Sequence, residues 1–396
     1  MARHEARRNP TRLCSALRGR RRRMRILILL LLAALSARAA PVEVIDSELG
    51  PVEIRTIARG LNSPWALAFL PDGRFLITER GGTMHIIEPD GRIGAPLAGV
   101  PEVYANGQGG LLDVVLDPDF ASNRTLYFSY AAPGAEGAHT AIASARLEPG
   151  TLANLRVLFR QQPGYDGGQH FGSRIVIGRD GFLYASVGER GDHRDRAQQL
   201  DKTYGKIIRI ARDGTVPEDN PFVGRAGADP SVWSYGHRNP QGLTLHPITG
   251  ELFEHEHGPR GGDEINLIRK GANYGWPVIT NGREYYGPKI GEGTAKTGME
   301  QPLHQWTPSI APSGMAFLST PAAGAWNGHL FVGALKFTLL ARLELQHGKV
   351  VHEERLLAHR KDRIRDVRQG PDSALYLLTE TQGLLLRLRP PPARGT

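Results

Sequence analysis

A histidine between glycines is the first candidate for acid–base chemistry in the sequence. His170 lies in residues 167–174, directly before the apolar run 175–177. Imidazole has an unperturbed pKa of about 6.5, which suits a general base near neutral pH. Glycines at a strand entrance let such a ring project into a pocket. A purely structural histidine is the alternative that these residues leave open.

Two other loops offer neutral and cationic hydrogen-bond donors. Gln108 lies in the glycine-rich residues 106–113, where the backbone can approach a flat ligand closely. Arg238 and Asn239 lie in residues 233–242 and present a charged donor fork beside an amide. An ordinary glycine turn and a surface salt bridge are the respective alternatives.

Residues 254–266 combine acids with a Gly-Pro pair. Carboxylates and backbone carbonyls in one loop are typical of a site for a hard cation such as calcium. His255 and His257 alternate on one strand face and could begin a zinc site, but no third ligand is evident. A salt-bridged turn without a metal is the other interpretation.

A cationic cluster follows near the C-terminus. In an alternating strand Arg363 and Arg365 share one face. Together with Lys336 they predict a site for a polycarboxylate or a phosphate. A solvated run of surface charge is the alternative.

The elements that position these loops follow a repeated pattern. A turn residue precedes two apolar strand formers six times, and the last residues of the repeats are 51, 57, 69, 78 and 45 positions apart. Short strands, frequent turns and this period predict an all-β, six-bladed β-propeller with long inter-strand loops forming the active-site face. The longest insertions lie between Tyr184 and Phe331, where we expect function to concentrate. An irregular β-sandwich is the alternative fold.

The first 40 residues predict an export signal. A basic stretch ends at Arg25, an apolar run of about ten residues follows, and small residues then form an A-x-A cleavage pattern. The apolar run is shorter than the ~20 residues of a membrane span, although an uncleaved anchor remains the alternative. We therefore predict a cleaved signal peptide over residues 1–40, a catalytic domain over residues 41–396, and a periplasmic or secreted protein without stable membrane insertion.

The net positive charge of the chain comes from residues 1–40. The full sequence has 49 Lys and Arg against 40 Asp and Glu, but residues 1–40 hold eleven Arg and one acid. The remaining chain has 38 basic and 39 acidic side chains, so no global charge favours nucleic acid. Cys14, the one cysteine, also lies in the leader, which excludes disulfides and cysteine-based zinc sites from the mature domain.

Six ordered segments together carry a family resemblance. They are residues 107–113, 170–172, 234–242, 257–266, 273–277 and 363–367. On these motifs the chain resembles the soluble aldose sugar dehydrogenases that use pyrroloquinoline quinone (PQQ), relatives of soluble quinoprotein glucose dehydrogenase. The match extends over about residues 52–390. The family fold is a six-bladed β-propeller, in agreement with the repeat count.

The resemblance implies roles for individual residues. His170 matches the catalytic base, and Arg238 matches the arginine that stabilises charge beside the reactive quinone carbonyl. The implied cofactor-binding positions are Gln108, Arg238, Asn239, Tyr285, Ala334, Leu335, Lys336, Arg363, Ile364 and Arg365. The implied calcium ligands are the carbonyls of Gly258 and Pro259 at the cofactor and, for a second ion, Glu264 and Tyr274.

The implied activity is oxidation of the C1 hydroxyl of aldoses to lactones. PQQ and Ca²⁺ are the expected cofactors, an external acceptor takes the electrons, and the protein is a monomer or homodimer. Gln169 precedes the expected base where glucose-specific relatives carry an Asp, which bears on rate and substrate preference. The alternatives are a calcium-dependent sugar-lactone hydrolase and a non-catalytic propeller that binds glycan or protein.

Overall fold

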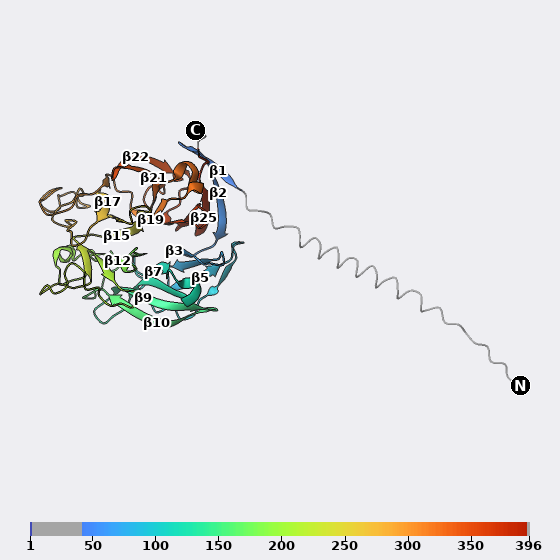
Figure 1. The fold of residues 1–396 in the computed structure, drawn as a ribbon, viewed down its shortest axis with the longest axis horizontal. Coiled ribbons are helices and arrows are strands. Elements are labelled where there is room, and N and C mark those ends of the chain that lie inside the picture. Colours follow the sequence, from blue (N-terminus) through green and yellow to red (C-terminus); the bar gives the residue numbers. More distant parts are fainter. Residues whose placement is uncertain (2–41, 394–396) are drawn as a thin grey trace. The chain divides into compact units, whose positions relative to one another are not determined.

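The chain after residue 41 folds into six antiparallel sheets arranged in a ring (Figure 1). This computed structural model describes Met1 and residues 42–393. The predicted signal peptide lies outside the described residues apart from Met1, so its cleavage stays a prediction. In the described part of the chain, no helix is both long and apolar enough to span a membrane. The predicted six-bladed β-propeller is confirmed.

The strands of each sheet run in order from the centre of the ring outward. The first two sheets are β3 (Pro64–Phe69), β4 (Phe75–Glu79), β5 (Thr83–Ile87), β6 (Ile93–Pro96), and β7 (Leu111–Leu116), β8 (Thr125–Ala132), β9 (His139–Glu148), β10 (Thr151–Arg160). The next two are β11 (Gly172–Ile177), β12 (Leu183–Val187), β13 (Lys206–Ile210), β14 (Val232–Tyr235), and β15 (Pro240–Leu245), β16 (Leu252–Glu256), β17 (Asp263–Ile268), β18 (His304–Trp306). The last two are β19 (Pro312–Leu318), β20 (His329–Ala334), β21 (Leu340–Gln346), β22 (Lys349–Leu356), and β23 (Ile364–Gln369), β24 (Leu375–Thr379), β25 (Leu384–Arg389), β2 (Gly50–Arg59), β1 (Glu43–Ser47). Short helical turns are α2 (Phe120–Asn123), η1 (Arg194–Gln198), η2 (Pro321–Trp326) and η3 (Ala358–Arg360).

The six turn-and-strand repeats are the hairpins between the inner and second strands. Each repeat lies at the start of β4, β8, β12, β16, β20 or β24. Gly73 and Gly181 adopt φ values of +86° and +81° in two of these turns, a region that L side chains rarely adopt. The Asp-Gly pairs therefore mark real hairpins because glycine meets the backbone requirement of the turn.

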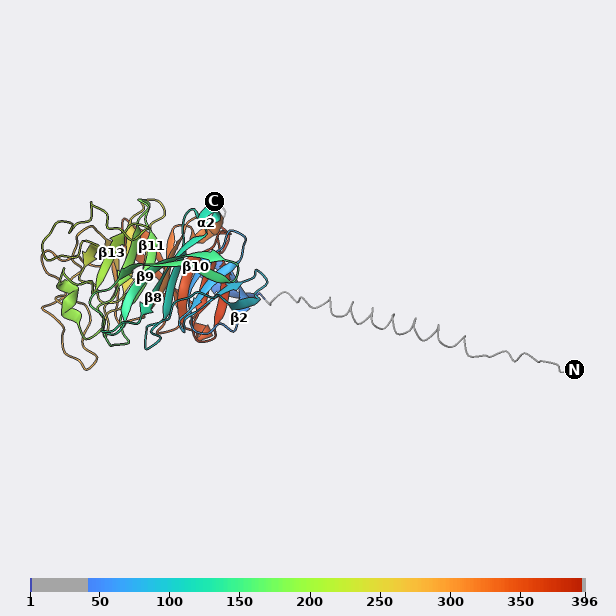
Figure 2. The same cartoon turned by 90° about the horizontal axis from the view of Figure 1, so that it is seen from below.

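Antiparallel pairing decides which loops meet. The start of each inner strand lies beside the end of the second strand, so these two sets of loop residues share one face of the ring. The longest connections are residues 188–205, 211–231 and 269–303, within the interval where the sequence predicts them. The loops of the third and fourth sheets extend well beyond their strands (Figure 2).

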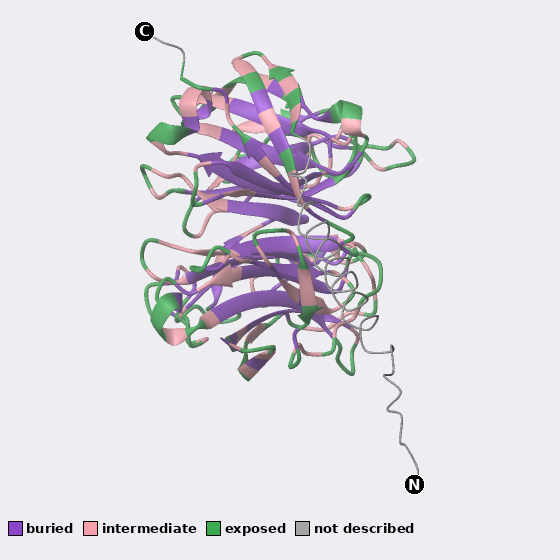
Figure 3. Cartoon of the chain, turned by 90° about the vertical axis from the view of Figure 1, so that its right-hand side faces the viewer, coloured by how far each residue is buried: buried purple, intermediate pink, exposed green. Residues whose placement is uncertain are grey.

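The core lies between neighbouring sheets, whose inner strands are buried over most of their length (Figure 3). The sixth sheet joins both ends of the described domain, because β2 pairs with β25 and places Ile54 opposite Leu388. Both side chains are buried in one cluster with Trp326 of η2 and Phe331 of β20. Ring closure therefore depends on a strand from each end of the domain.

Four charged side chains, three of them buried and Arg368 partly buried, join the inner strands. Arg174 of β11 places Nη1 3.2 Å from Asp113 Oδ1 on β7 and 2.9 Å from Asp366 Oδ1 on β23. Arg368 of β23 contacts the same two carboxylates at 2.5 and 2.9 Å. Two cations thus balance two anions, and removing one partner would leave a buried charge unpaired, at a cost of about 3–5 kcal/mol.

We expect Ile54→Ala to weaken ring closure. The substitution leaves a cavity where β2 meets β25, so the free energy of unfolding should fall by about 2–5 kcal/mol. Val44→Ala is the matched control, since Val44 lies on β1 and is 59% exposed. Urea denaturation of both variants measures the difference, and equal midpoints would contradict the role assigned to β2.

Candidate active site

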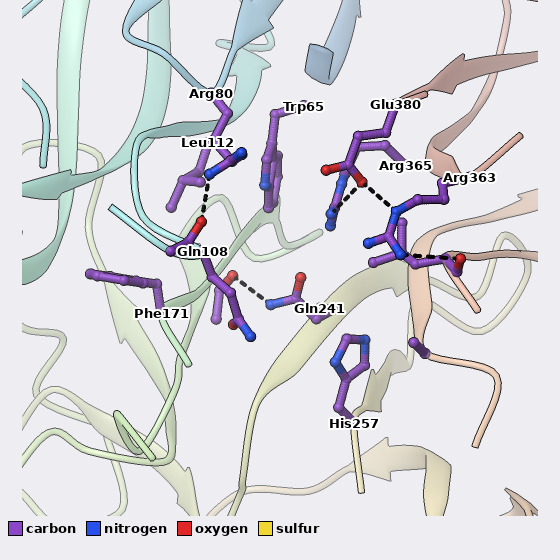
Figure 4. A pocket seen from close by; sticks show the side chains of 14 residues that line it. Trp65, Arg80, Gln108, Leu112, Phe171, Gln241, His257, Arg363, Arg365 and Glu380 are labelled. Carbon is purple, nitrogen blue, oxygen red and sulfur yellow. Dashed lines mark hydrogen bonds and ion pairs between the residues drawn. The ribbon is translucent and has the colours of Figure 1, made fainter. Parts of the chain in front are cut away.

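Two adjoining chambers open where the inner strands begin. The inner chamber has a volume of about 230 Å³ and the outer one about 940 Å³, and both are lined by Gln108, His257 and Ala311. The inner chamber is also lined by Trp65, Phe171, Leu335, Arg363, Arg365 and Glu380, among others (Figure 4). The outer chamber adds His170, Arg238, Gly258, Pro259, Tyr285 and Lys336. Most of the predicted site residues therefore meet in one place.

His170 lies just before β11 with its ring almost fully buried. Its Nδ1 is 2.6 Å from Glu189 Oε2, and its backbone N–H donates to Gln108 Oε1 at 3.0 Å. Burial and the nearby Arg238 guanidinium hold the pKa of His170 below its ordinary value, although Glu189 opposes this. A carboxylate can only accept a hydrogen bond, so Nδ1 carries the proton and Nε2 is free to accept one. The imidazole is therefore set up as a neutral base.

Glu189 is a site residue that the sequence reasoning missed. It follows β12 in the segment 188–191, and its Oε2 also accepts the Gly191 N–H at 2.6 Å. Burial raises the pKa of Glu189, but His170, Arg238 and the Gly191 N–H together hold it below its ordinary value. Gln169 does not face His170 with a carboxylate, yet the structure supplies one from another strand. The signal in the sequence was an acid between glycines at a strand end on the site face.

Arg238 is held by the backbone around it. Nη1 donates to the carbonyls of His257 at 3.0 Å and Gly258 at 2.9 Å, while the Arg238 N–H donates to Glu256. Its Nε is buried without a partner, so one donor remains for a ligand. The guanidinium carbon also lies 5.3 Å from the centre of the Trp276 ring.

Two amides connect the loop before β7 and the start of β11 to the segment before β15. Asn239 is fully buried, and its Oδ1 accepts the Gly172 N–H at 3.2 Å. Its Nδ2 lies 3.4 Å from Gln108 Oε1, which also holds the backbone of His170. Gln108 therefore contacts the backbone of the expected base and lines both chambers.

The predicted cationic face forms one wall of the inner chamber. Arg363 Nε and Arg365 Nη2 contact the same Glu380 oxygen at 3.1 and 3.0 Å, which confirms that the two arginines share a face (Figure 4). Arg363 also donates to the Leu335 carbonyl at 3.3 Å. Burial raises the pKa of Glu380, but Arg365 and Arg363 outweigh it and hold the pKa low. Glu380 was not predicted, because it comes from the next strand of the sheet.

The other predicted cofactor residues divide between the chambers and the core. Leu335 lines the inner chamber, and Lys336 and Tyr285 line the outer one. Ala334 and Ile364 are buried and line neither chamber; the Ile364 carbonyl accepts the Ser313 hydroxyl at 2.6 Å. Their backbone, and not their side chains, is what lies next to the chamber-lining Leu335, Arg363 and Arg365.

The four predicted calcium ligands lie in two places. Gly258 and Pro259 line the outer chamber, and their carbonyls accept hydrogen bonds from Arg238 at 2.9 Å and from the Ser309 hydroxyl at 3.4 Å. Glu264 lies on β17, opposite Glu256 on β16. Tyr274 follows in the next loop and lines neither chamber.

A buried cluster that contains two acids lies beside the second pair. His237, Glu254 and Glu256 bring potential metal-binding atoms within 4.8 Å of one another, the one such group found among the described residues. Glu254 Oε1 is buried without a partner, and burial together with Glu256 raises its pKa well above the ordinary value. Burial likewise raises the pKa of Glu256 to about 8. The ring of Tyr274 stacks on His237 with centres 4.6 Å apart. The expected zinc alternative of His255 and His257 gains no third ligand in this part of the chain.

The site and fold belong to a known family. Residues 61–387 match the family model described as glucose/sorbosone dehydrogenase, so the chain is a member of that family. The aldose sugar dehydrogenase YliI of Escherichia coli is 46% identical over 346 residues, which cover 86% of this chain and 93% of the relative. Quinoprotein glucose dehydrogenase B of Acinetobacter calcoaceticus is 30% identical over 71% of this chain and 63% of its own length.

Solved structures of similar proteins have the same fold. The apo-form of the soluble aldose sugar dehydrogenase from Escherichia coli superposes with a TM-score of 0.84 at 45% identity, covering 86% of this chain and all of that one. The PQQ-bound aldose sugar dehydrogenase from Streptomyces coelicolor gives a TM-score of 0.72 at 32% identity, covering 89% and 99%.

We expect the pKa of His170 to depend on its two charged neighbours, Arg238 and Glu189. In the wild type, imidazole NMR signals of His170 should titrate below pH 6.5, because burial and Arg238 disfavour the cation. Glu189→Gln removes the carboxylate that favours the cation, so the pKa should fall further. Asp192→Asn is the control, since Asp192 is an exposed acid in the same loop. A higher pKa in Glu189→Gln would contradict the pairing.

Proposed function

We propose that this chain is a PQQ- and calcium-dependent dehydrogenase that oxidises the C1 hydroxyl of aldose sugars to lactones and passes the electrons to an external acceptor. One observation carries the proposal: a buried, neutral His170 paired with Glu189 faces a chamber that continues into a wall of cations. Membership of the glucose/sorbosone dehydrogenase family supports it, as does the PQQ-bound relative at 32% identity.

The residues present fit PQQ, which is a planar tricarboxylate. Arg363 and Arg365 on the inner wall and Lys336 beside it would hold carboxylates, and Gln108 and Asn239 would supply amide contacts. The buried Arg238 Nε has no partner within the protein, which is the kind of donor that a bound carbonyl would satisfy. When bound, PQQ supplies an electrophilic quinone carbon that accepts a hydride.

The protein's own groups have separable roles in this reaction. Nε2 of His170 takes the proton of the C1 hydroxyl as the hydride leaves C1. Glu189 then stabilises the imidazolium through Nδ1 and keeps the ring in one orientation. Arg238, fixed by two backbone carbonyls, places its positive charge where negative charge develops.

The composition of the acidic cluster suits a bound calcium ion better than a core without a cation. Glu254, Glu256 and Glu264 are close together, and such carboxylates in a buried site must be protonated or share a cation. Glu256 also holds the backbone N–H groups of Arg238 and Asn239, so this site would support the chamber from behind. The carbonyls of Gly258 and Pro259 would serve an ion at the cofactor.

Export completes the proposal. The arginine-rich, then apolar N-terminus is the basis for placing the mature domain in the periplasm or outside the cell, as a monomer or homodimer. The sugar and the electron acceptor would then meet the enzyme outside the cytoplasm.

Reconstitution with PQQ and calcium tests the activity. An aldose and a redox dye are added to the purified protein, and we expect bleaching that depends on PQQ. His170→Ala should lower kcat by about 10²–10⁴-fold, because it removes the base, while PQQ binding persists. His347→Ala, in an exposed turn, is the matched control. Full turnover by His170→Ala would show that His170 is not the base. If the wild type oxidised no aldose, the proposal would be rejected, and the lactone hydrolase or a binding propeller would remain.

The acidic cluster predicts stabilisation by calcium. Calcium at about 100 times its Kd adds about 2.7 kcal/mol, so the melting temperature of the chelator-treated protein should rise by several degrees. Glu254→Gln should reduce this rise because it removes a ligand from the cluster. Glu102→Gln, an exposed acid, should behave as the wild type. An equal rise in Glu254→Gln would show that calcium binds elsewhere.

A further inference from the structure

Two arginines face each other across the outer chamber wall. Arg260 and Arg283 form an antiparallel bridge, with the Arg260 N–H 3.0 Å from the Arg283 carbonyl and the reverse pair 3.2 Å apart. Both side chains line the chamber that contains His170. Lys289 lies opposite Arg283 in a second bridge. Like charges directly opposite one another are unfavourable, and both arginines are exposed to solvent.

These cations have no anionic partner in the described residues. Neither Arg260 nor Arg283 forms a side-chain ion pair or hydrogen bond within the described chain. The adjacent Glu284 is already bound by Arg194 at 2.6 Å. Asp263, a carboxyl of the same chamber, accepts the N–H groups of Gly258 and Ala311 at 2.8 and 2.7 Å. The positive charge of this wall is therefore uncompensated.

The inner chamber is built differently. There Glu380 bridges Arg363 and Arg365, and in the proposed function the carboxylates of PQQ account for these arginines and for Lys336. Arg260 and Arg283 are left over after that assignment. The domain without its leader is almost neutral, so two unpaired arginines in one concave site form a local field for a small anion.

We propose that the outer chamber recognises an aldose that carries a carboxylate away from C1, that is, a hexuronic acid. This inference rests on the proposed function. Arg260 and Arg283 bind the sugar carboxylate, for which the planar guanidinium is suited, while C1 faces His170. Tyr285 lines the same chamber at 70% exposure and offers a ring face to the sugar.

The carboxylate of the sugar does not change the chemistry at C1. C1 loses a hydride to the quinone cofactor and its hydroxyl loses a proton to His170, so the ring C1–O–H becomes a lactone carbonyl. The remote carboxylate neither gains nor loses atoms or electrons. It serves only in binding, and its effect should therefore appear in KM and in kcat/KM.

Paired substrates test the inference. With the PQQ- and calcium-loaded protein at low ionic strength, kcat/KM for glucuronate should exceed that for glucose by about tenfold or more, as charge-assisted hydrogen bonds allow. The ratio should fall in 0.5 M salt because exposed charges are screened. In Arg260→Gln/Arg283→Gln the ratio should fall to about one. In Arg55→Gln/Lys349→Gln, which removes two exposed charges from outside the chambers, the ratio should persist.

Reversing the charge at Arg283 distinguishes a loss of substrate recognition from a loss of folding. Arg283→Glu should lower the glucuronate-to-glucose ratio below one and favour glucosamine, whose amine is cationic. Oxidation of glucose without any preference for glucuronate would overturn this inference but leave the proposed function intact, whereas oxidation of neither sugar would reject both. If the double variant kept the sugar ratio but lost rate only with an acidic electron-acceptor protein, the arginines would serve that partner, and the substrate assignment would be wrong.

Discussion

The buried ion network between the inner strands is the constraint on which the site depends. Asp113, Arg174 and Asp366 come from three different sheets and fix the rotation of their strands relative to one another. Arg365 lies directly before Asp366, at a register shift between β23 and β24, and lines the inner chamber. Arg174 also lies 4.2 Å from the ring centre of Trp65, which lines that chamber. The floor of the site is thus built from the same contacts that hold the ring together.

Charge is distributed unevenly over a domain that is nearly neutral overall. The chamber-lining cations are only partly matched by carboxylates such as Glu380, whereas elsewhere most arginines have an acid nearby. Such a site loses stability to self-repulsion and gains it back when an anion binds.

The structure treats its buried carboxylates in two ways. Glu189 has a histidine and a backbone N–H as partners and keeps a low pKa, so it acts through charge. Glu254 and Glu256 lie two residues apart on β16, and burial raises the pKa of both. The first arrangement suits proton transfer and the second suits a cation, and both lie against the backbone around Arg238.

The sequence by itself determined the propeller and the order of the motifs, because turn residues and the spacing of strand formers are local properties. It also offered His170, Gln108, Arg238 and the cationic segment as candidate site residues. Only the tertiary structure decided that Glu189 pairs with His170, that Glu380 contacts both arginines, and that His237, Glu254 and Glu256 form one cluster. Ala334 and Ile364 proved to be buried beside the site instead of lining it. The reason is physical: these contacts join residues from different strands and loops, and no local pattern encodes the distance between them.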